Sequence, residues 1–429
     1  MFSHCLKLSY KDTAQQNSYV TIPRADNSFD NTEIAANVDE DIIDSLTGGR
    51  LVGSVTSFEN FAECPLRYYL RYGVDLKERE EFTFSPVNFG VVLHAVIREV
   101  CDEIKKNGES YYLISEEKRR EMVKRSVAAI TDIYQNSILK DSSRNLFMIK
   151  RMEDLADRTV WAMGKQLKCG DFVPFVFEHK FNMEVGDGDR KQLMSGTIDR
   201  VDICENGTDV YVRIIDYKTG KKDFNIVKTY YGIDIQLMVY MEAAMKLVAK
   251  MRPGKNVIPA GVFYYNISDP IVSATTESAE EIEDKIKGEL RLKGMVNSDK
   301  DIAEKMDNTE GTSLNIPVSR KADGGFDSRR SKVMNTEQFN MLGRFVDVRA
   351  IDTADRIAGG DIRRSPYKDG QFSSCDRCPY GAVCGFSVDL PGCNYRKLKK
   401  FDDEVLWNNI KEGVDENGKK MDTGAEERD

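Results

Sequence analysis

The chain has 429 residues, of which 41% are hydrophobic and 31% are charged, and its formal net charge at pH 7 is −9. This length is enough for two or three folding units with a sizeable core, and no apolar run approaches the roughly 20 residues that a membrane span needs. The negative charge is concentrated in residues 24–50 and 401–429. It therefore does not exclude a polyanionic partner for the near-neutral remainder.

The N-terminal part is polar before the first helical pattern begins. Residues 1–50 show no sustained periodicity, so we expect an irregular or truncated segment there. The pattern Thr56-x-x-Glu59 then predicts a capping box at the start of a helix. Pro65 disfavours helical geometry in the residue before it, which predicts a junction between two helices at Cys64.

The rest of the chain first shows helical and then strand periodicity. We expect helices over 87–106, 115–138, 144–168, 226–249, 276–294 and 335–357. We expect strands over 173–184, 193–204, 209–218 and 258–265, and a loop or insertion over 295–334. The series indicates an α/β fold.

Two of the expected strands form a hairpin that gathers charged residues on one apolar face. An Asn206-Gly207 turn predicts that Asp199 lies opposite Ile214. Residues two apart on a strand share a face, so Asp216 and Lys218 join Asp199 there. The same face carries Val201, Ile203, Val210 and Val212.

Carboxylates on an apolar face are costly unless they are paired or bind a metal. For a single Asp-x-Lys pattern, a buried salt bridge is the ordinary interpretation. Here two acids converge with a lysine, which favours a site for Mg²⁺ or Mn²⁺, because these ions take one or two protein carboxylates. Lys218 would then orient or help to deprotonate the attacking water.

These segments carry a family resemblance. The stretches Gly-Thr-Ile-Asp-Arg-Val-Asp at 196–202 and Ile-Asp-Tyr-Lys-Thr-Gly at 215–220 resemble motifs of the PD-(D/E)XK nuclease superfamily, in its RecB-like branch. Gly90-x-x-x-His94 and Gln236-x-x-x-Tyr240 resemble its flanking helices, with each pair on one helical face.

The resemblance implies a restriction-endonuclease-like core, with a mixed central sheet flanked by helices, and a set of catalytic residues. These would be Asp199, Asp216 and His94 as metal ligands, Lys218 beside the nucleophile, and Gln236 and Tyr240 in contact with metal-bound water or the substrate strand. Glu178 would assist the site from the preceding strand, and His179 is interpreted as strand surface.

A group of cysteines near the C-terminus predicts a metal centre. Cys375, Cys378 and Cys384 follow a C-x2-C-x5-C spacing, and nine cysteines without an export signal indicate a reducing, cytoplasmic location. The stretch around Cys64 resembles the segment that supplies the fourth ligand in AddB-type nuclease domains, which implies a [4Fe-4S] cluster. Spacing alone also suits zinc, and Cys393 is a competing ligand outside the family spacing.

The resemblance covers residues 51–400 and is strongest to the C-terminal nuclease domain of AddB-type subunits of helicase-nucleases, with 401–429 as an acidic tail. It implies a metal-dependent DNA exonuclease that acts in DNA end processing and double-strand-break repair beside a helicase partner and digests the 5′-ended strand. The alternative is a catalytically idle module that binds DNA ends or a helicase. Basic residues proposed to hold DNA phosphates are Lys118, Arg119, Arg120, Lys124, Arg125, Arg363, Arg364 and Lys368.

Overall fold

The computed structural model describes residue 38 and residues 52–77, 86–133, 142–185, 192–273, 277–390 and 393–426. The expected irregular segment 1–50 therefore lies almost entirely outside the described residues, as does the end of the helix expected over 115–138. Within the described part, no helix combines the length and apolar character that crossing a membrane requires.

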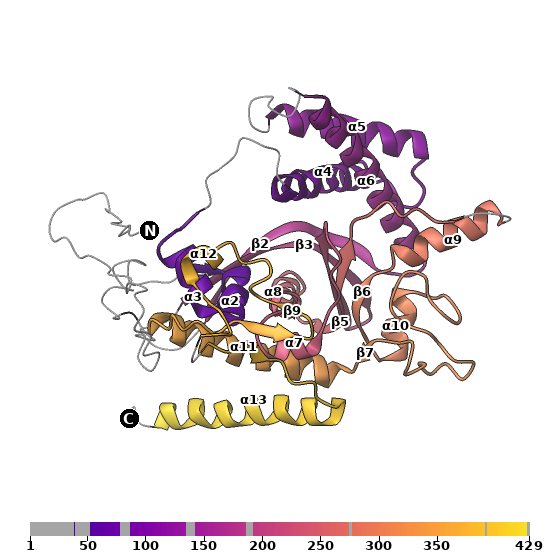
Figure 1. Ribbon diagram of the computed structural model, residues 1–429. Helices are drawn as coiled ribbons and strands as arrows, with labels where there is room; N and C mark the ends of the chain where they lie inside the picture. The colour runs from indigo at the N-terminus through magenta and orange to yellow at the C-terminus, as the bar shows by residue number, and fades with distance from the viewer. Residues whose placement is uncertain are drawn as a thin grey trace.

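A mixed seven-stranded sheet forms the centre of the described part (Figure 1). Its order is β1-β3-β4-β5-β6-β7, and β2 also pairs with β3. The strand β3 is antiparallel to both β2 and β4, whereas β4 and β5 are parallel. The strands are β1 (Val52–Ser54), β2 (Val173–Val185), β3 (Gln192–Asn206), β4 (Asp209–Lys218), β5 (Asn256–Asn266), β6 (Lys293–Asn297) and β7 (Val333–Met334).

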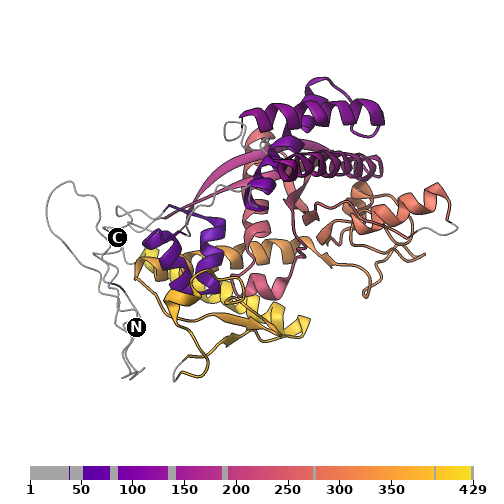
Figure 2. The same cartoon turned by 45° about the horizontal axis from the view of Figure 1, so that its top comes forward.

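Helices cover both faces of this sheet (Figures 1 and 2). On one face, α4 (Pro86–Lys106), α5 (Glu116–Ile133) and α6 (Ser143–Lys168) bury apolar residues against Tyr211, Ile215 and Phe263. On the other face, α2 (Val55–Glu63), α8 (Gln236–Met251) and α11 (Thr336–Ala358) pack on Val212 and Ile214. Because both faces are covered, β4 is buried along nearly its whole length.

The predicted hairpin forms, but its register differs by two residues from the expectation. The turn lies at Gly207, whose φ of 60° is in the region that favours glycine. The ladder runs from Asn206–Asp209 to Arg200–Ile215, so Asp199 lies across from Asp216 rather than from Ile214. A slip of two residues does not change the face on which a paired side chain lies, so the apolar residues of the predicted face, such as Val201, Ile203, Val212 and Ile214, are buried together as expected.

Three further expectations need correction. Segment 295–334 is not only a loop, because it contains the end of β6, α10 (Lys300–Met306) and β7. The helix expected over 226–249 is two helices, α7 (Ile226–Tyr230) and α8. The first helix is capped by Ser54, which accepts a hydrogen bond from the Ser57 N–H, and not by Thr56. For the two helical segments the hydrophobic period was right, but the ends of the helices depended on local capping.

The C-terminal part packs onto the nuclease-like core. The helix α13 (Asp403–Glu426) starts inside the segment expected to be an acidic tail, and Leu406 and Ile410 are buried with α11. A small second sheet joins β8 (Tyr367–Asp369), β9 (Phe372–Ser373) and β10 (Arg396–Lys397). It precedes and follows the short helix α12 (Gly381–Cys384), which lies beside α2 and α3 (Pro65–Tyr68) in both views (Figures 1 and 2).

Candidate active site

The two motif aspartates lie where the β3–β4 ladder ends. The last paired residues are Arg200 and Ile215, so Asp199 and Asp216 come directly after the last pair. Asp199 Oδ2 accepts a 2.7 Å hydrogen bond from the backbone N–H of Tyr217. The Asp199 carboxylate thus accepts a backbone hydrogen bond just beyond the last pair of the ladder. This bond fixes the Asp199 side chain against β4.

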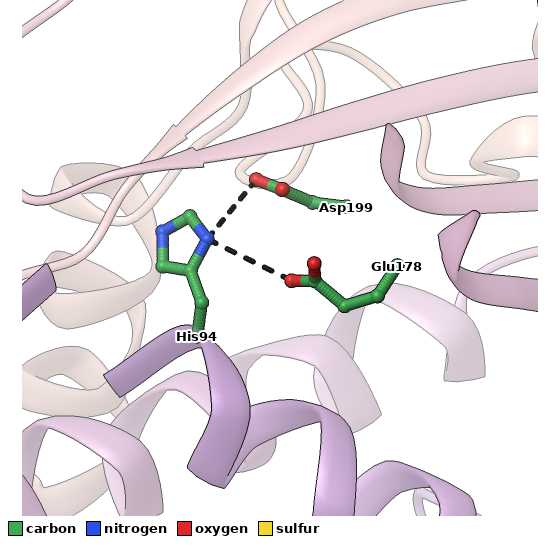
Figure 3. A group of neighbouring side chains, drawn as sticks. All are labelled: His94, Glu178 and Asp199. Carbon is green, nitrogen blue, oxygen red and sulfur yellow. Dashed lines mark ion pairs between the residues drawn. The ribbon is translucent and has the colours of Figure 1, made fainter. Parts of the chain in front are cut away.

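His94 and Glu178 meet Asp199 from two other elements (Figure 3). His94 projects from α4, and its Nδ1 lies 3.5 Å from Asp199 Oδ2 and 3.8 Å from Glu178 Oε1. Each of the three residues offers a ligand atom within 4.8 Å of the others. Within the described part of the chain, this arrangement suits a metal ion, with one nitrogen and two carboxylate oxygens facing a common point.

The structure therefore places Glu178, and not Asp216, in one group with His94 and Asp199. Glu178, expected only to assist, belongs to the His94–Asp199 group, whereas Asp216 is outside that group. Glu178 comes across from Asp199 because β2 pairs Phe177 with Arg200 on β3. Glu178 itself has a φ of 48°, so the regular extended conformation of β2 is interrupted at the residue that faces the site.

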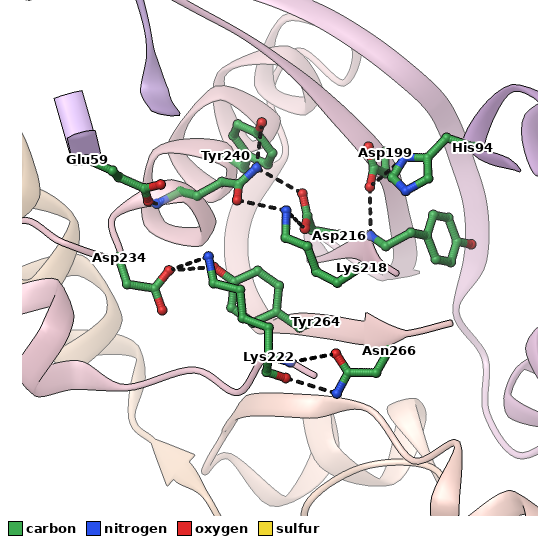
Figure 4. Close-up of polar contacts among 12 residues, drawn as sticks. Glu59, His94, Asp199, Asp216, Lys218, Lys222, Asp234, Tyr240, Tyr264 and Asn266 are labelled. Atoms are coloured by element: carbon green, nitrogen blue, oxygen red, sulfur yellow. Dashed lines mark hydrogen bonds and ion pairs between the residues drawn. The ribbon is translucent and has the colours of Figure 1, made fainter. Parts of the chain in front are cut away.

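Asp216 lies at the centre of a second group of polar contacts (Figure 4). Lys218 Nζ lies 2.5 Å from its Oδ2, and the Gln236 side-chain amide donates a 3.0 Å hydrogen bond to its Oδ1. Gln236 also accepts a 3.0 Å hydrogen bond from Lys218 Nζ and donates one of 2.9 Å to the Tyr240 hydroxyl. The four residues implied by the last two motifs are thus joined in one network.

The electrostatics of the site indicate an excess of negative charge. Burial, with the Asp199 charge, raises the pKa of Asp216 to about 6. Burial and Asp199 likewise raise the pKa of Glu178 to about 7. Burial would lower the pKa of His94, but the surrounding carboxylates, Asp199 first, raise it above its ordinary value. A divalent cation would offset this repulsion, so the residues present fit a metal ion.

The four cysteines of the predicted centre line one hollow, together with Leu66 and Tyr380. Cys64 lies between α2 and α3, whereas Cys375, Cys378 and Cys384 come from the chain around α12. Burial raises the pKa of Cys64, while backbone amides against its sulfur, that of Arg67 first, oppose this increase. Cys393 is buried elsewhere and does not line the hollow. The donor set and the space fit a thiolate-bound metal centre.

Most of the basic residues expected to hold DNA are already paired with acids. On α5, Lys118 pairs with Glu109 at 2.7 Å, and the buried Arg119 forms a two-point pair with Asp157. Arg120 and Arg125 also pair with acids, and Arg363 with Asp361. These contacts favour a structural role on the α5 surface over phosphate binding.

Comparison with known proteins identifies the family of this site. A model of the PD-(D/E)XK nuclease superfamily matches residues 53–385. The chain belongs to this superfamily. The match spans β1 to α12, and so contains both the carboxylate site and the four cysteines.

Curated relatives are subunits of larger enzymes, the ATP-dependent helicase/deoxyribonucleases. The chain is 34% identical over 399 residues to such a protein of Lachnoclostridium phytofermentans, covering 90% of this chain and 34% of that protein. Proteins of the same description from a Thermoanaerobacter species and Clostridium acetobutylicum are each 33% identical, over 86% and 87% of this chain and 33% of theirs. The chain thus spans about a third of the length of the curated relatives it matches.

The sequence motifs of this PD-(D/E)XK domain account for most of the candidate site but give little weight to Glu178. His94, Asp199, Asp216, Lys218, Gln236 and Tyr240 all lie in the two connected groups described above. The sequence predicted only an assisting role for Glu178, because no local pattern gives the register between β2 and β3. The sequence does show an acid on the strand before the hairpin. Only the pairing of Phe177 with Arg200 places this acid beside Asp199.

Proposed function

We propose that this domain is a Mg²⁺- or Mn²⁺-dependent deoxyribonuclease that hydrolyses phosphodiester bonds. The observation that carries the proposal is the convergence of His94, Glu178 and Asp199 beside the Asp216–Lys218 pair. His94, Asp199 and Asp216 would hold the metal ion, with Glu178 as a further ligand. A bound divalent ion lowers the pKa of its water ligand and so supplies a hydroxide nucleophile at neutral pH.

Each residue of the network then has a separate task. Lys218 Nζ is held by Asp216 at 2.5 Å and by the Gln236 carbonyl at 3.0 Å, and from this position its ammonium would orient the water that attacks phosphorus. Gln236 holds Asp216 and Lys218 in a fixed relation, and Tyr240 fixes the Gln236 amide. We assign Gln236 and Tyr240 to the metal-bound water or the substrate strand, where their polar groups complete the site.

The biological setting follows from the relatives. Their description as subunits of ATP-dependent helicase/deoxyribonucleases supports a role for this domain as the nuclease part of a helicase-nuclease. We propose that it acts as an exonuclease on DNA ends during double-strand-break repair, with an ATP-driven helicase as its partner. Digestion of the 5′-ended strand, from 5′ to 3′, is the polarity that the family resemblance supports.

We further propose that Cys64, Cys375, Cys378 and Cys384 hold a [4Fe-4S] cluster. Their shared hollow supports a four-thiolate centre, and the resemblance to AddB-type domains favours iron-sulfur over zinc. The cluster would join α2 to the chain around α12, because its ligands come from both. It would act as a structural clip, at a place separate from the Asp216 group.

A nuclease assay with matched controls tests the proposal. The purified chain is incubated with linear single-stranded and double-stranded DNA, labelled at the 5′ or the 3′ end, with Mg²⁺ or with EDTA. We expect cleavage with Mg²⁺, none with EDTA, and none in Asp216→Asn. Covalently closed circular DNA should survive if the enzyme is an exonuclease. DNA binding without cleavage in any metal would favour the idle binding module instead.

A further inference from the structure

The catalytic-motif helix α8 begins without a capping side chain of its own. Its N-cap residue is Ile235, whose side chain has no hydrogen-bonding group. The first N–H groups of a helix have no partner inside the helix and need an acceptor from elsewhere. Here that acceptor is Glu59 of α2: its Oε1 accepts hydrogen bonds of 2.9 Å from the Ile235 N–H and 3.0 Å from the Gln236 N–H (Figure 4).

The residue held in this way is the one that connects the polar network. Gln236 is the first residue of α8, and its side chain contacts Asp216, Lys218 and Tyr240. The first turn of a helix frays when its N–H groups lack partners. Because the Gln236 backbone and side chain move together, loss of the Glu59 acceptor would displace the amide from Asp216 and Lys218.

Residues near Glu59 also hold the chain segment that leads into α8. Lys222 Nζ lies 3.0 Å from Asp234 Oδ1, which also accepts a 2.6 Å hydrogen bond from the Tyr264 hydroxyl. Lys222 lies over the Tyr264 ring, and its backbone is bonded on both sides by Asn266 (Figure 4). The chain just before α8 is therefore firmly held. The N–H groups at the start of α8 still depend on Glu59 of α2 as their acceptor.

We infer that Glu59 is a positioning residue: by capping α8 from α2, it holds Gln236 in the geometry that orients Asp216 and Lys218. The inference rests on the proposed nuclease function, and it gives a role to a residue that the motif assignments above leave without one. Burial raises the pKa of Glu59 to about 7. Protonation at one oxygen leaves the other able to accept the two N–H bonds, so the capping role does not require the charge.

Glu59 also gives α2 a direct contact with the active site. The same helix ends at Cys64, so one nine-residue helix, Val55–Glu63, links the proposed cluster ligand and the α8 cap. A change at the cysteine hollow that shifts α2 would reach Gln236 through Glu59. No contact between the hollow and the metal group is needed for this effect.

Two substitutions with opposite expectations test the role of Glu59. Glu59→Met removes the acceptor at similar length, and Glu59→Gln keeps a carbonyl oxygen that can accept both bonds. With Mg²⁺ and linear DNA, we expect the Met variant to lose about tenfold or more in kcat with KM little changed, since displacement of a positioning group costs mainly turnover. The Gln variant should stay within about threefold of the wild type.

Amide hydrogen exchange supplies a readout that is independent of activity. In the metal-free protein, a peptide covering residues 233–240 should exchange faster in Glu59→Met than in the wild type, and at the wild-type rate in Glu59→Gln. The matched control is Asn335→Ala, which removes the side-chain cap of α11. It should lower Tm to a similar extent as Glu59→Met and leave kcat unchanged.

The outcomes separate this inference from the proposed function. If the wild type cuts DNA and Asp216→Asn does not, but Glu59→Met keeps full kcat and normal exchange at 233–240, the inference is wrong and the function stands. The inference is also wrong if Glu59→Gln is as impaired as Glu59→Met, or if Asn335→Ala loses kcat equally. If the wild type has no metal-dependent cleavage, the proposed function itself fails.

Discussion

The side-chain amide of Gln236 donates a 3.0 Å hydrogen bond to Asp216, and the carbonyl of the same side chain accepts one of equal length from Lys218. A single neutral group thereby holds an acid and a base that also pair directly at 2.5 Å. An amide is suited to this position, because it presents a donor and an acceptor together. Neither a carboxylate nor an alkyl side chain would bind both partners.

Replacement of Gln236 should therefore affect turnover more than binding or folding. We expect Gln236→Leu to lower kcat with Mg²⁺ by roughly 10- to 100-fold, because Lys218 loses one of its two orienting contacts. Tyr240→Phe removes only the 2.9 Å bond to the amide and should cost less. Steady-state kinetics on linear DNA measure both; equal kcat in Gln236→Leu and the wild type would exclude the network from catalysis.

The two aspartates of the Gly196–Asp202 motif should behave in opposite ways. Asp202 is completely buried between Arg200 and Arg213, with hydrogen bonds of 2.6–2.8 Å. Asp202→Asn leaves these cations without a matching charge and should cost about 3–5 kcal/mol of unfolding free energy. Asp199→Asn should abolish cleavage with Tm unchanged or raised, because it removes a crowded carboxylate. Urea unfolding and the nuclease assay, run on both variants, check this contrast.

The cysteine hollow predicts a visible cofactor. Anaerobically purified protein should be brown with about four irons per chain, and Cys64→Ala should lose the colour. Cys393→Ser should keep it, because Cys393 does not line the hollow. Iron and zinc analysis by plasma emission decides the metal. Stoichiometric zinc without iron would replace the cluster by a zinc centre.

Loss of the centre should loosen both segments that it joins. A cross-link that closes so long a loop stabilises by up to ~5 kcal/mol on a loop-entropy estimate. In Cys64→Ala, limited proteolysis should cut first around residues 52–73 and 366–390, and the β3–β4 hairpin should survive longer. Digestion of these segments at the wild-type rate would show that the cysteines do not hold them together.

A carboxyl pair between α8 and α11 predicts a pH dependence of stability. Burial first, and then the bond to Glu242, raise the pKa of Asp347 to about 8. The folded state therefore binds a proton that the unfolded chain releases above about pH 4, so this contribution to stability is lost as pH rises toward 8. Asp347→Asn should be more stable than the wild type at pH 8, on the order of 1 kcal/mol, with a smaller difference near pH 4.

Thermal unfolding from pH 4 to pH 8 measures this difference. The matched control is Asp352→Asn on the exposed side of the same helix, where Asp352 pairs only loosely with Arg356 at 3.8 Å. Its stability relative to the wild type should not change over the same range. A gain for Asp347→Asn that is constant with pH would show that the pKa of Asp347 is not raised in the folded protein.

The sequence by itself determined the fold class and the apolar face of the hairpin. The period-2 alternation of β3 and β4 places Val201, Ile203, Val212 and Ile214 on one face, and these residues are buried together although the predicted register is wrong by two residues, since only an odd slip would reverse the face. The four-residue spacing of Gln236 and Tyr240 likewise predicts their shared helical face, and their side chains do bond to each other.

Only the tertiary structure decided which distant groups complete these local patterns. Glu178 reaches His94 through the β2–β3 register, and Glu59 caps α8 from a helix far away in the chain. Cys64 meets Cys378 and Cys384 from a distant part of the chain. Local periodicity specifies which way a side chain points relative to its own helix or strand. Local periodicity does not specify which other helix or strand packs against that side chain. The packing partner is set by the way the helices bury both faces of the sheet.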